Sequence, residues 1–206
     1  MKKRLFLLLL LLCVVVVGAG VLAYPKTPTE DQLTNLLGKA EGVYALGFDN
    51  VFEIGKQEVS LRSPAEEVIG YYDEILNYEE VVSEIFTQNG REQLESSGYG
   101  SLPRFLKKDG KIYRASNTLN NSMEYLKEIS SVKLLERTWN TFTYEAVVTP
   151  LYQWLDETEK QDSQTIAFTV RIQDGKLKVE KLDYPGASGD EIGYTQEELD
   201  SISWHE

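Results

Sequence analysis

Few side chains in this sequence could carry out chemistry, since histidine and cysteine are each present once. His205 lies next to the last residue, and Cys13 lies inside an apolar run. A Ser-His-Asp or Cys-His hydrolase would therefore need its base at the end of the chain. One cysteine and one histidine cannot form an intrachain disulfide or a Cys/His zinc site, so we predict no metal.

Carboxylate pairs are the remaining equipment for acid–base catalysis. The candidate pairs, each adjacent in sequence, are Glu66/Glu67, Asp73/Glu74, Glu79/Glu80 and Glu197/Glu198. Neighbouring residues on a helix point about 100° apart, whereas a glycosidase holds two carboxylates about 5–10 Å apart across a cleft. We expect these pairs on solvated helix faces, and we predict no catalytic residue, no cofactor and no enzymatic activity. An enzyme acting on wall glycan is the least favoured alternative.

A further acidic group occupies residues 156–162. Its members are Asp156, Glu157, Glu159 and Asp162. The Asp-x-Asp-x-Asp-Gly order of an EF-hand calcium loop is absent, and Lys160 lies among the acids. We therefore predict an acidic hairpin loop and no calcium site. Trp154, just before it, has two interpretations: an anchor for a partner, or a cap on the open end of a sheet core.

The charge of the chain disfavours nucleic acid as a partner. The 206 residues include 21 basic and 33 acidic side chains, and without Lys2, Lys3 and Arg4 the balance is 18 against 33, a net charge of −15. Phosphate binding needs a basic surface, which this composition does not supply. Residues 64–95 hold nine acids and one base, whereas residues 101–149 hold eight bases and five acids. The acidic part is either an ordinary solvated face or a surface that attracts a basic partner.

The N-terminus predicts export. Residues 5–23 carry no charge and approach the roughly 20 residues that a helix needs to cross a bilayer. The basic residues 2–4 stay on the cytoplasmic side, so the rest of the chain faces outward. A cleaved signal peptide and an uncut anchor are both open, and the second implies membrane contact. The expected organisation is a signal peptide or anchor over 1–23, a linker over 24–28, an extracytoplasmic domain over 29–184 and an acidic tail with a short helix over 185–206.

The first half of the chain has the apolar spacing of helices. Thr29 and Gln32 form a capping-box pattern at the start of one helix. Ser63-Pro64-Ala65-Glu66 predicts a second helix that buries one side through Leu76. A third helix is predicted from Asn77 through Phe86, and a last helical turn after Asn89-Gly90.

In the second half the period changes to that of strands. Asp109-Gly110 and Asp174-Gly175 predict two-residue hairpin turns. Further predicted elements are an extended segment over 51–62, a short helix within 118–130, strands over 132–137 and 141–152, and a final helix from Thr195. Helices followed by antiparallel strands predict an α+β fold, with N-terminal helices packed on a C-terminal antiparallel β-meander.

Several short motifs between Tyr72 and Tyr152 occur in a characteristic order. They are Ile85-Phe86-Thr87, Asn89-Gly90-Arg91, Asp109-Gly110-Lys111-Ile112-Tyr113-Arg114 and Val147-Val148-Thr149-Pro150. This order resembles IseA, a family of exported Bacillus-type proteins that inhibit cell-wall DL-endopeptidases. The resemblance implies a secreted, non-enzymatic inhibitor whose acidic surface docks on the basic groove of an NlpC/P60-type catalytic domain.

We therefore expect an exported monomeric binding protein that contacts a cell-wall hydrolase through acidic residues. The predicted contact residues are Glu66, Glu67, Asp73, Glu80, Trp154, Asp156, Glu157, Glu159 and Asp162. The alternative is an NTF2-like or cystatin-like ligand-binding or scaffold module, in which helices cover a curved antiparallel sheet. That alternative predicts a deep apolar pocket between Tyr72, Phe86, Tyr113 and Tyr144.

Overall fold

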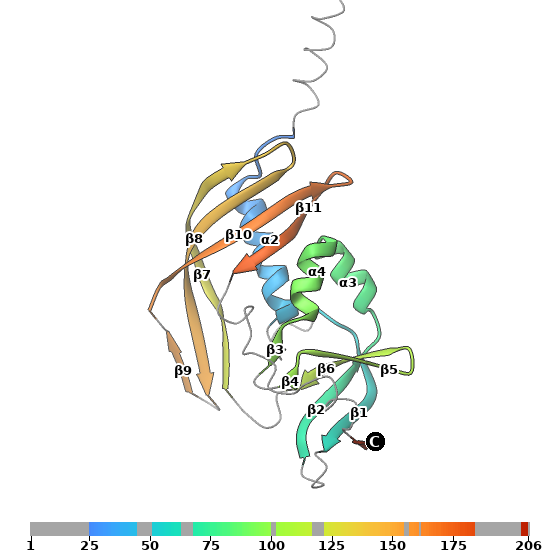
Figure 1. Ribbon diagram of the computed structural model, residues 1–206. Coiled ribbons are helices and arrows are strands. Elements are labelled where there is room, and N and C mark those ends of the chain that lie inside the picture. The colour runs from blue at the N-terminus through green and yellow to red at the C-terminus, as the bar shows by residue number, and fades with distance from the viewer. Residues whose placement is uncertain are drawn as a thin grey trace, which may run out of the picture.

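The described residues fold into three helices and two main antiparallel sheets, an α+β architecture (Figure 1). The computed structural model describes residues 25–44, 51–62, 68–99, 102–116, 122–154, 157–160, 162–183 and 203–205. The helices are α2 (Glu30–Tyr44), α3 (Tyr78–Ile85) and α4 (Gln88–Glu95). As predicted, the helices pack on a C-terminal antiparallel meander.

The larger sheet contains the strands of the C-terminal half in the order β11-β10-β8-β7. Its strands are β7 (Ser122–Arg137), β8 (Thr141–Trp154), β10 (Gln164–Gln173) and β11 (Lys176–Asp183), and β9 (Glu157–Lys160) pairs with the far part of β8. The predicted core face of β8 is confirmed: Phe142, Tyr144, Ala146 and Val148 are all buried. Helix α2 crosses the sheet and contacts both β7 and β11.

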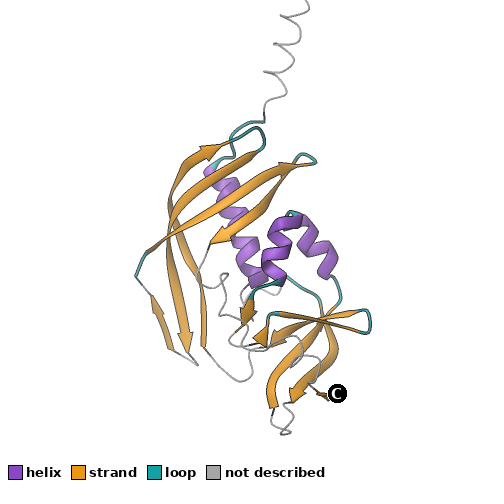
Figure 2. Ribbon diagram, viewed as in Figure 1, coloured by secondary structure: helices purple, strands orange, loops and turns teal. Residues whose placement is uncertain are grey.

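The smaller sheet has the order β12-β1-β2-β6-β5. Its strands are β1 (Ile54–Arg62), β2 (Val68–Ile75), β5 (Phe105–Lys108), β6 (Lys111–Ser116) and β12 (Ser203–His205), and a separate two-stranded sheet pairs β3 (Gly98–Tyr99) with β4 (Leu102–Pro103). Helices α3 and α4 lie between the two main sheets (Figure 2). The predicted extended segment over 51–62 is confirmed as β1.

Two hydrophobic clusters hold these layers together. The main cluster joins the three helices to the larger sheet and reaches the smaller one through Ile75 and Phe105. Within it, the Tyr78 ring lies edge-on to Phe105 at 5.2 Å. A second cluster joins Leu102 of β4 to five residues of the smaller sheet, Val59, Leu61, Tyr72, Tyr113 and Ala115.

The capping box at Thr29 and the two Asp-Gly turns are confirmed in atomic detail, whereas Asn77 makes no side-chain capping bond at the start of α3. The Thr29 backbone N–H donates to Gln32 Oε1 at 2.9 Å, and the Gln32 N–H donates to Thr29 Oγ1 at 3.3 Å, so the capping box starts α2. Asp109-Gly110 and Asp174-Gly175 have φ of 52° and 77°, and 52° and 75°. Positive φ at both central residues is the geometry of a type I′ hairpin turn.

Two predicted helices are strands, and a third has a different start. Residues 68–75 form β2, because its β-branched and aromatic side chains pair between β1 and β6. Residues 122–130 belong to β7, where pairing with β8 overrides their helix propensity. Helix α4 begins at Gln88 and contains Gly90, which was predicted to precede the helical turn.

Several predictions concern residues outside those described: the apolar segment 5–23, Glu66, Glu67, Asp156 and the helix from Thr195. In the described ranges, no helix combines the length and hydropathy needed to cross a membrane. The final described residues, 203–205, pair with β1 as strand β12.

Candidate functional site

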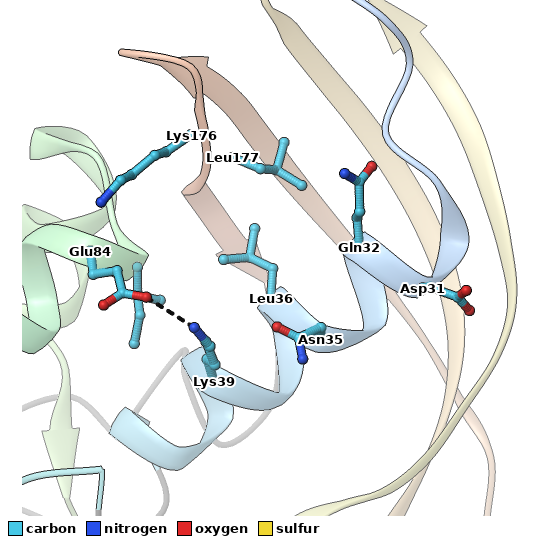
Figure 3. Close-up of a pocket in the computed structure, with 9 residues that line it drawn as sticks. Asp31, Gln32, Asn35, Leu36, Lys39, Glu84, Lys176 and Leu177 are labelled. Atoms are coloured by element: carbon cyan, nitrogen blue, oxygen red, sulfur yellow. Dashed lines mark hydrogen bonds and ion pairs between the residues drawn. The ribbon is translucent and has the colours of Figure 1, made fainter.

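An open groove of about 500 Å³ lies between α2, α3 and the start of β11 (Figure 3). Its floor is apolar and consists of Leu36, Ile85 and Leu177, of which the first two are buried. Its rim is polar and charged, with Asp31, Gln32, Asn35, Lys39, Glu84 and Lys176. An apolar floor inside a charged rim suits the insertion of a side chain or loop from a partner.

An ion pair spans the α2–α3 side of the groove. Lys39 Nζ lies 2.9 Å from Glu84 Oε1, and Figure 3 shows the two side chains meeting from different helices. The hydrogen bond from Lys39 and the charge of that lysine lower the pKa of Glu84. Both side chains are about half exposed, so the pair adds little stability and its charges stay accessible.

The groove is bordered by an acidic row on α3, which we define as Glu80 and Glu84. Residues four apart lie on the same side of a helix, one turn from each other. Both glutamates are exposed. The groove lining holds two acids, Asp31 and Glu84, and two bases, Lys39 and Lys176, so its formal charges cancel. Glu80, one turn before Glu84 on α3 and outside this lining, adds a further negative charge.

Helices α3 and α4 are joined by a charged network centred on Arg91. Arg91 donates from Nη1 and Nη2 to the two carboxylate oxygens of Glu79 at 2.6 and 2.7 Å, and from Nε to Glu95 at 2.8 Å. Glu95 also accepts from Tyr78 Oη at 2.9 Å and from Lys107 Nζ at 3.2 Å. A bidentate arginine fixes orientation as well as distance, so the network sets the angle between the helices.

The same helix pair is attached to the outer edge of β11. The Thr87 N–H donates to the Val179 carbonyl at 2.9 Å. Gln93 bonds the Leu182 backbone in both directions, accepting at 3.0 Å and donating at 2.8 Å. Lys178 Nζ donates to the Ser83 carbonyl near the end of α3 at 2.6 Å. These bonds to β11 therefore hold the backbone of α3, which carries the acidic row, in a fixed position.

Acid is expected to weaken the Arg91 network. The hydrogen bond from Arg91 lowers the pKa of Glu79 from its usual 4.5. Burial alone would raise the pKa of Glu95, but hydrogen bonds from Arg91, Tyr78 and Lys107 outweigh burial, so the pKa of Glu95 is also lowered. A carboxyl group whose pKa is lower in the folded state stabilises the fold above its unfolded pKa, and this stability is lost as pH falls through the folded value.

Arg91→Gln should therefore lower the free energy of unfolding by about 1 kcal/mol at neutral pH and by much less near about pH 3. Urea denaturation at both pH values measures the difference. Lys56→Gln, which changes an exposed cation on β1, is the control and should show no such pH dependence. An equal loss at both pH values for Arg91→Gln would contradict the role of the network.

The predicted contact residues that the structure describes lie on different elements rather than on one helix face. Glu80 is exposed on α3, whereas Asp73 pairs across the sheet with Arg114, from β2 to β6. Burial raises the pKa of Asp73, and the charge of Arg114 opposes that shift only partly. Of the acidic helical region expected between Glu66 and Glu84, only α3 is helical in the described residues, because residues 68–75 form β2.

Four further predicted positions, Trp154, Glu157, Glu159 and Asp162, lie on or next to β9, whereas α3 contacts β11 (Figure 1). Glu157 and Glu159 are residues of β9, which pairs with β8 so that Glu157 lies opposite Trp154. Asp162 is exposed just before β10. The predicted loop over 156–162 is therefore partly strand.

The groove residues Lys39, Glu84 and Leu177 were not predicted to meet, because no sequence pattern links positions so far apart in the chain.

The pocket expected for the alternative fold is not formed by its four predicted residues. Phe86 and Tyr144 belong to the main cluster, and Tyr72 and Tyr113 to the second cluster. Each is at most 4% exposed, so their side chains fill core space. Within the described part of the chain, no three acidic, histidine or cysteine side chains are grouped to hold a metal ion.

Comparisons with protein-family models, curated proteins and solved structures give no match to this chain. We therefore infer a function from the geometry of the groove and the resemblance of the motifs.

Proposed function

We propose that this chain is an exported protein that binds and inhibits a peptidoglycan DL-endopeptidase of the NlpC/P60 type, without catalysis of its own. The observation that supports the proposal is the groove between α2, α3 and β11 together with the acidic row beside it. The resemblance of the Ile85–Thr87 and Asp109–Arg114 motifs to IseA supplies the class of partner.

The groove and the acidic row have complementary roles in such a complex. Binding energy at protein interfaces is concentrated in a few side chains that fill apolar pockets, and Leu36, Ile85 and Leu177 offer such a floor. Charges at the rim mainly accelerate association and select the partner. Glu80 and Glu84 would attract the basic border of the hydrolase groove, while an apolar side chain of the hydrolase enters the pocket.

The support of α3 favours tight binding. Helices α3 and α4 are fixed to each other through Arg91 and to β11 through Thr87 and Gln93. A surface that is already ordered loses little conformational entropy on association. The backbone under the acidic row is therefore ready for docking without rearrangement.

Inhibition assays test this function. The full chain in detergent should reduce peptide release from peptidoglycan by the catalytic domain of an NlpC/P60 hydrolase. Glu80→Lys should weaken inhibition by about tenfold at low salt and much less at high salt, because salt screens the attraction. Glu58→Lys, the same charge change at an exposed site on β1, is the matched control. No inhibition, or equal effects of the two variants, would exclude this interface.

A ligand-binding module is the second candidate, favoured by the size of the same groove. Its roughly 500 Å³ lies within the range of small-molecule sites. Titration with the uncharged apolar probe N-phenyl-1-naphthylamine tests it, and Leu177→Trp should block binding by filling the groove. Glu80→Lys should leave probe binding unchanged, since Glu80 is outside the lining, and this separates the two functions.

A further inference from the structure

The start of the described chain is fixed to the turn between β7 and β8. Arg137, the last residue of β7, donates from Nη1 to Thr27 Oγ1 at 3.0 Å and from Nη2 to the Pro25 carbonyl. Its guanidinium also lies over the Phe142 ring, 5.1 Å from the centroid. Figure 1 shows this first segment, in blue, beside the β7–β8 turn. Pro25 and Thr27 are therefore part of the folded domain.

This attachment limits the distance between the β7–β8 turn and the apolar segment. Residues 5–23 carry no charge, and only Tyr24 separates them from Pro25. An extended residue spans at most about 3.6 Å, so Pro25 lies within about 7 Å of Ala23. The headgroup layer on each side of a bilayer is about 5–7 Å thick. With residues 5–23 in a membrane, Arg137 must lie at or next to the headgroups.

The turn carries an exposed tryptophan at this position. Trp139 is 52% exposed, and Leu134 and Leu135 on the preceding part of β7 are 39% and 50% exposed. These are three of the four large hydrophobic side chains that are exposed in the described residues. Tryptophan is enriched at membrane interfaces, where its ring is partly in apolar surroundings and its N–H remains hydrated.

The charge around the turn is balanced, unlike that of the whole chain. Residues 25–31 and 133–140 contain three cations, Lys26, Lys133 and Arg137, and three acids, Glu30, Asp31 and Glu136. Residues 68–99 hold seven acids and one base, and their helices α3 and α4 lie farther from this end (Figure 1). An anionic lipid surface therefore does not repel the β7–β8 end as it would repel the acidic helices.

We propose that the β7–β8 turn is a membrane seat: Trp139 lies in the lipid headgroup layer beside the point where an uncut N-terminal segment leaves the bilayer. The occupant of this surface is the phospholipid bilayer itself. The seat orients the domain, so that the smaller sheet and β12 point away from the membrane and the groove opens sideways. It depends on the exported, anchored form of the chain but not on any hydrolase.

Depth-dependent quenching tests the seat. The full chain with Trp154→Phe and Trp204→Phe, reconstituted in vesicles of phosphatidylglycerol and phosphatidylcholine, retains Trp139 alone. Lipids brominated near the glycerol should reduce its emission at least about twofold, and aqueous acrylamide should quench it less than in detergent. The matched control is the double variant Trp139→Phe and Trp154→Phe, which retains only Trp204 on β12, at the end of the domain away from the β7–β8 turn. The bromolipids should not reduce the emission of Trp204.

The outcomes are separable from those of the inhibition assay because no hydrolase is present. Trp139 emission that is insensitive to bromolipid and fully open to acrylamide, in a chain whose circular dichroism is native, would overturn the seat. Recovery from cells of only chains that begin after residue 23 would overturn it as well. Arg137→Gln provides a second variant: if it remains folded, it should reduce bromolipid quenching of Trp139 by releasing Pro25.

Discussion

Replacing Arg104 with alanine is expected to lower the free energy of unfolding by about 3–5 kcal/mol. Arg104 is only 3% exposed. Its Nε donates to Ser97 Oγ and its Nη2 to the Gly98 carbonyl, each at 3.0 Å, and its Nη1 donates to the Tyr44 carbonyl. Alanine would leave these buried acceptors without their donor and open a cavity where the side chain packs.

The position of Arg104 explains why the expected loss is large. Tyr44 is the last residue of α2, whose final carbonyls have no partner within the helix. A cation at a helix C-terminus is favourable, and here the guanidinium also lies over the Tyr44 ring at 5.3 Å. The Arg104 carbonyl accepts from the Ala115 N–H on β6 at 3.0 Å. One residue thus connects α2, packed on the larger sheet, to the smaller sheet.

Urea denaturation followed by circular dichroism measures this loss. Arg104→Lys should recover only part of it, because a single ammonium cannot reach three acceptors in the fixed geometry of a guanidinium. Lys56→Ala, on the exposed side of β1, is the surface control and should change stability by less than about 0.5 kcal/mol. Similar values for Arg104→Ala and Lys56→Ala would show that Arg104 does not join the two sheets.

Gly90→Ala is the second large expected effect, a loss of about 2–3 kcal/mol. A Cβ at Gly90 would lie 2.4 Å from the Val179 carbonyl oxygen and 3.2 Å from its carbon. Backbone atoms of a central contact cannot rotate away, so α4 would have to move off β11. The bonds of Thr87 to Val179 and of Gln93 to Leu182 would lengthen together.

The matched control for Gly90 is another helical glycine. Gly38 lies on the exposed side of α2, and a Cβ there would meet no atom within 4 Å. Gly38→Ala should therefore stabilise the protein by about 0.5–1 kcal/mol, because alanine loses less backbone entropy on folding. Thermal denaturation of both variants measures the opposite signs. A stabilising Gly90→Ala would exclude close packing of α4 on β11.

Sequence was sufficient where the bonds that define an element are local. The capping box of Thr29 and Gln32 and the two Asp-Gly turns use partners within a few residues. The sequence-based prediction failed at β2. Ser63-Pro64 has the pattern of a helix start, and the apolar residues around Tyr72 fit the spacing of a helix as well as that of a strand. Five of the eight residues in Val68–Ile75 are β-branched or aromatic, and that composition was the available signal for a strand.

The candidate site depends on contacts that sequence does not specify. Lys39 and Glu84 are 45 residues apart and meet only because α2 and α3 pack on the same larger sheet. Residues 122–130 include Met123, Leu126 and Lys127, which favour helices, but β8 offers them a partner along its whole length. Gly90 likewise has the pattern of a helix break, and only the approach of β11 gives it a packing role.

The short strand β12 has a practical consequence for anyone who trims this protein. Ser203–His205 cover Arg62, Leu61 and Ser60, so the backbone of β1 is hydrogen-bonded on that side. A truncation before residue 203 would uncover a row of amide and carbonyl groups, which recruits strands from other molecules and promotes aggregation. An epitope inserted at the solvent-facing Asp109-Gly110 turn would instead leave the pairing of β12 with β1 intact.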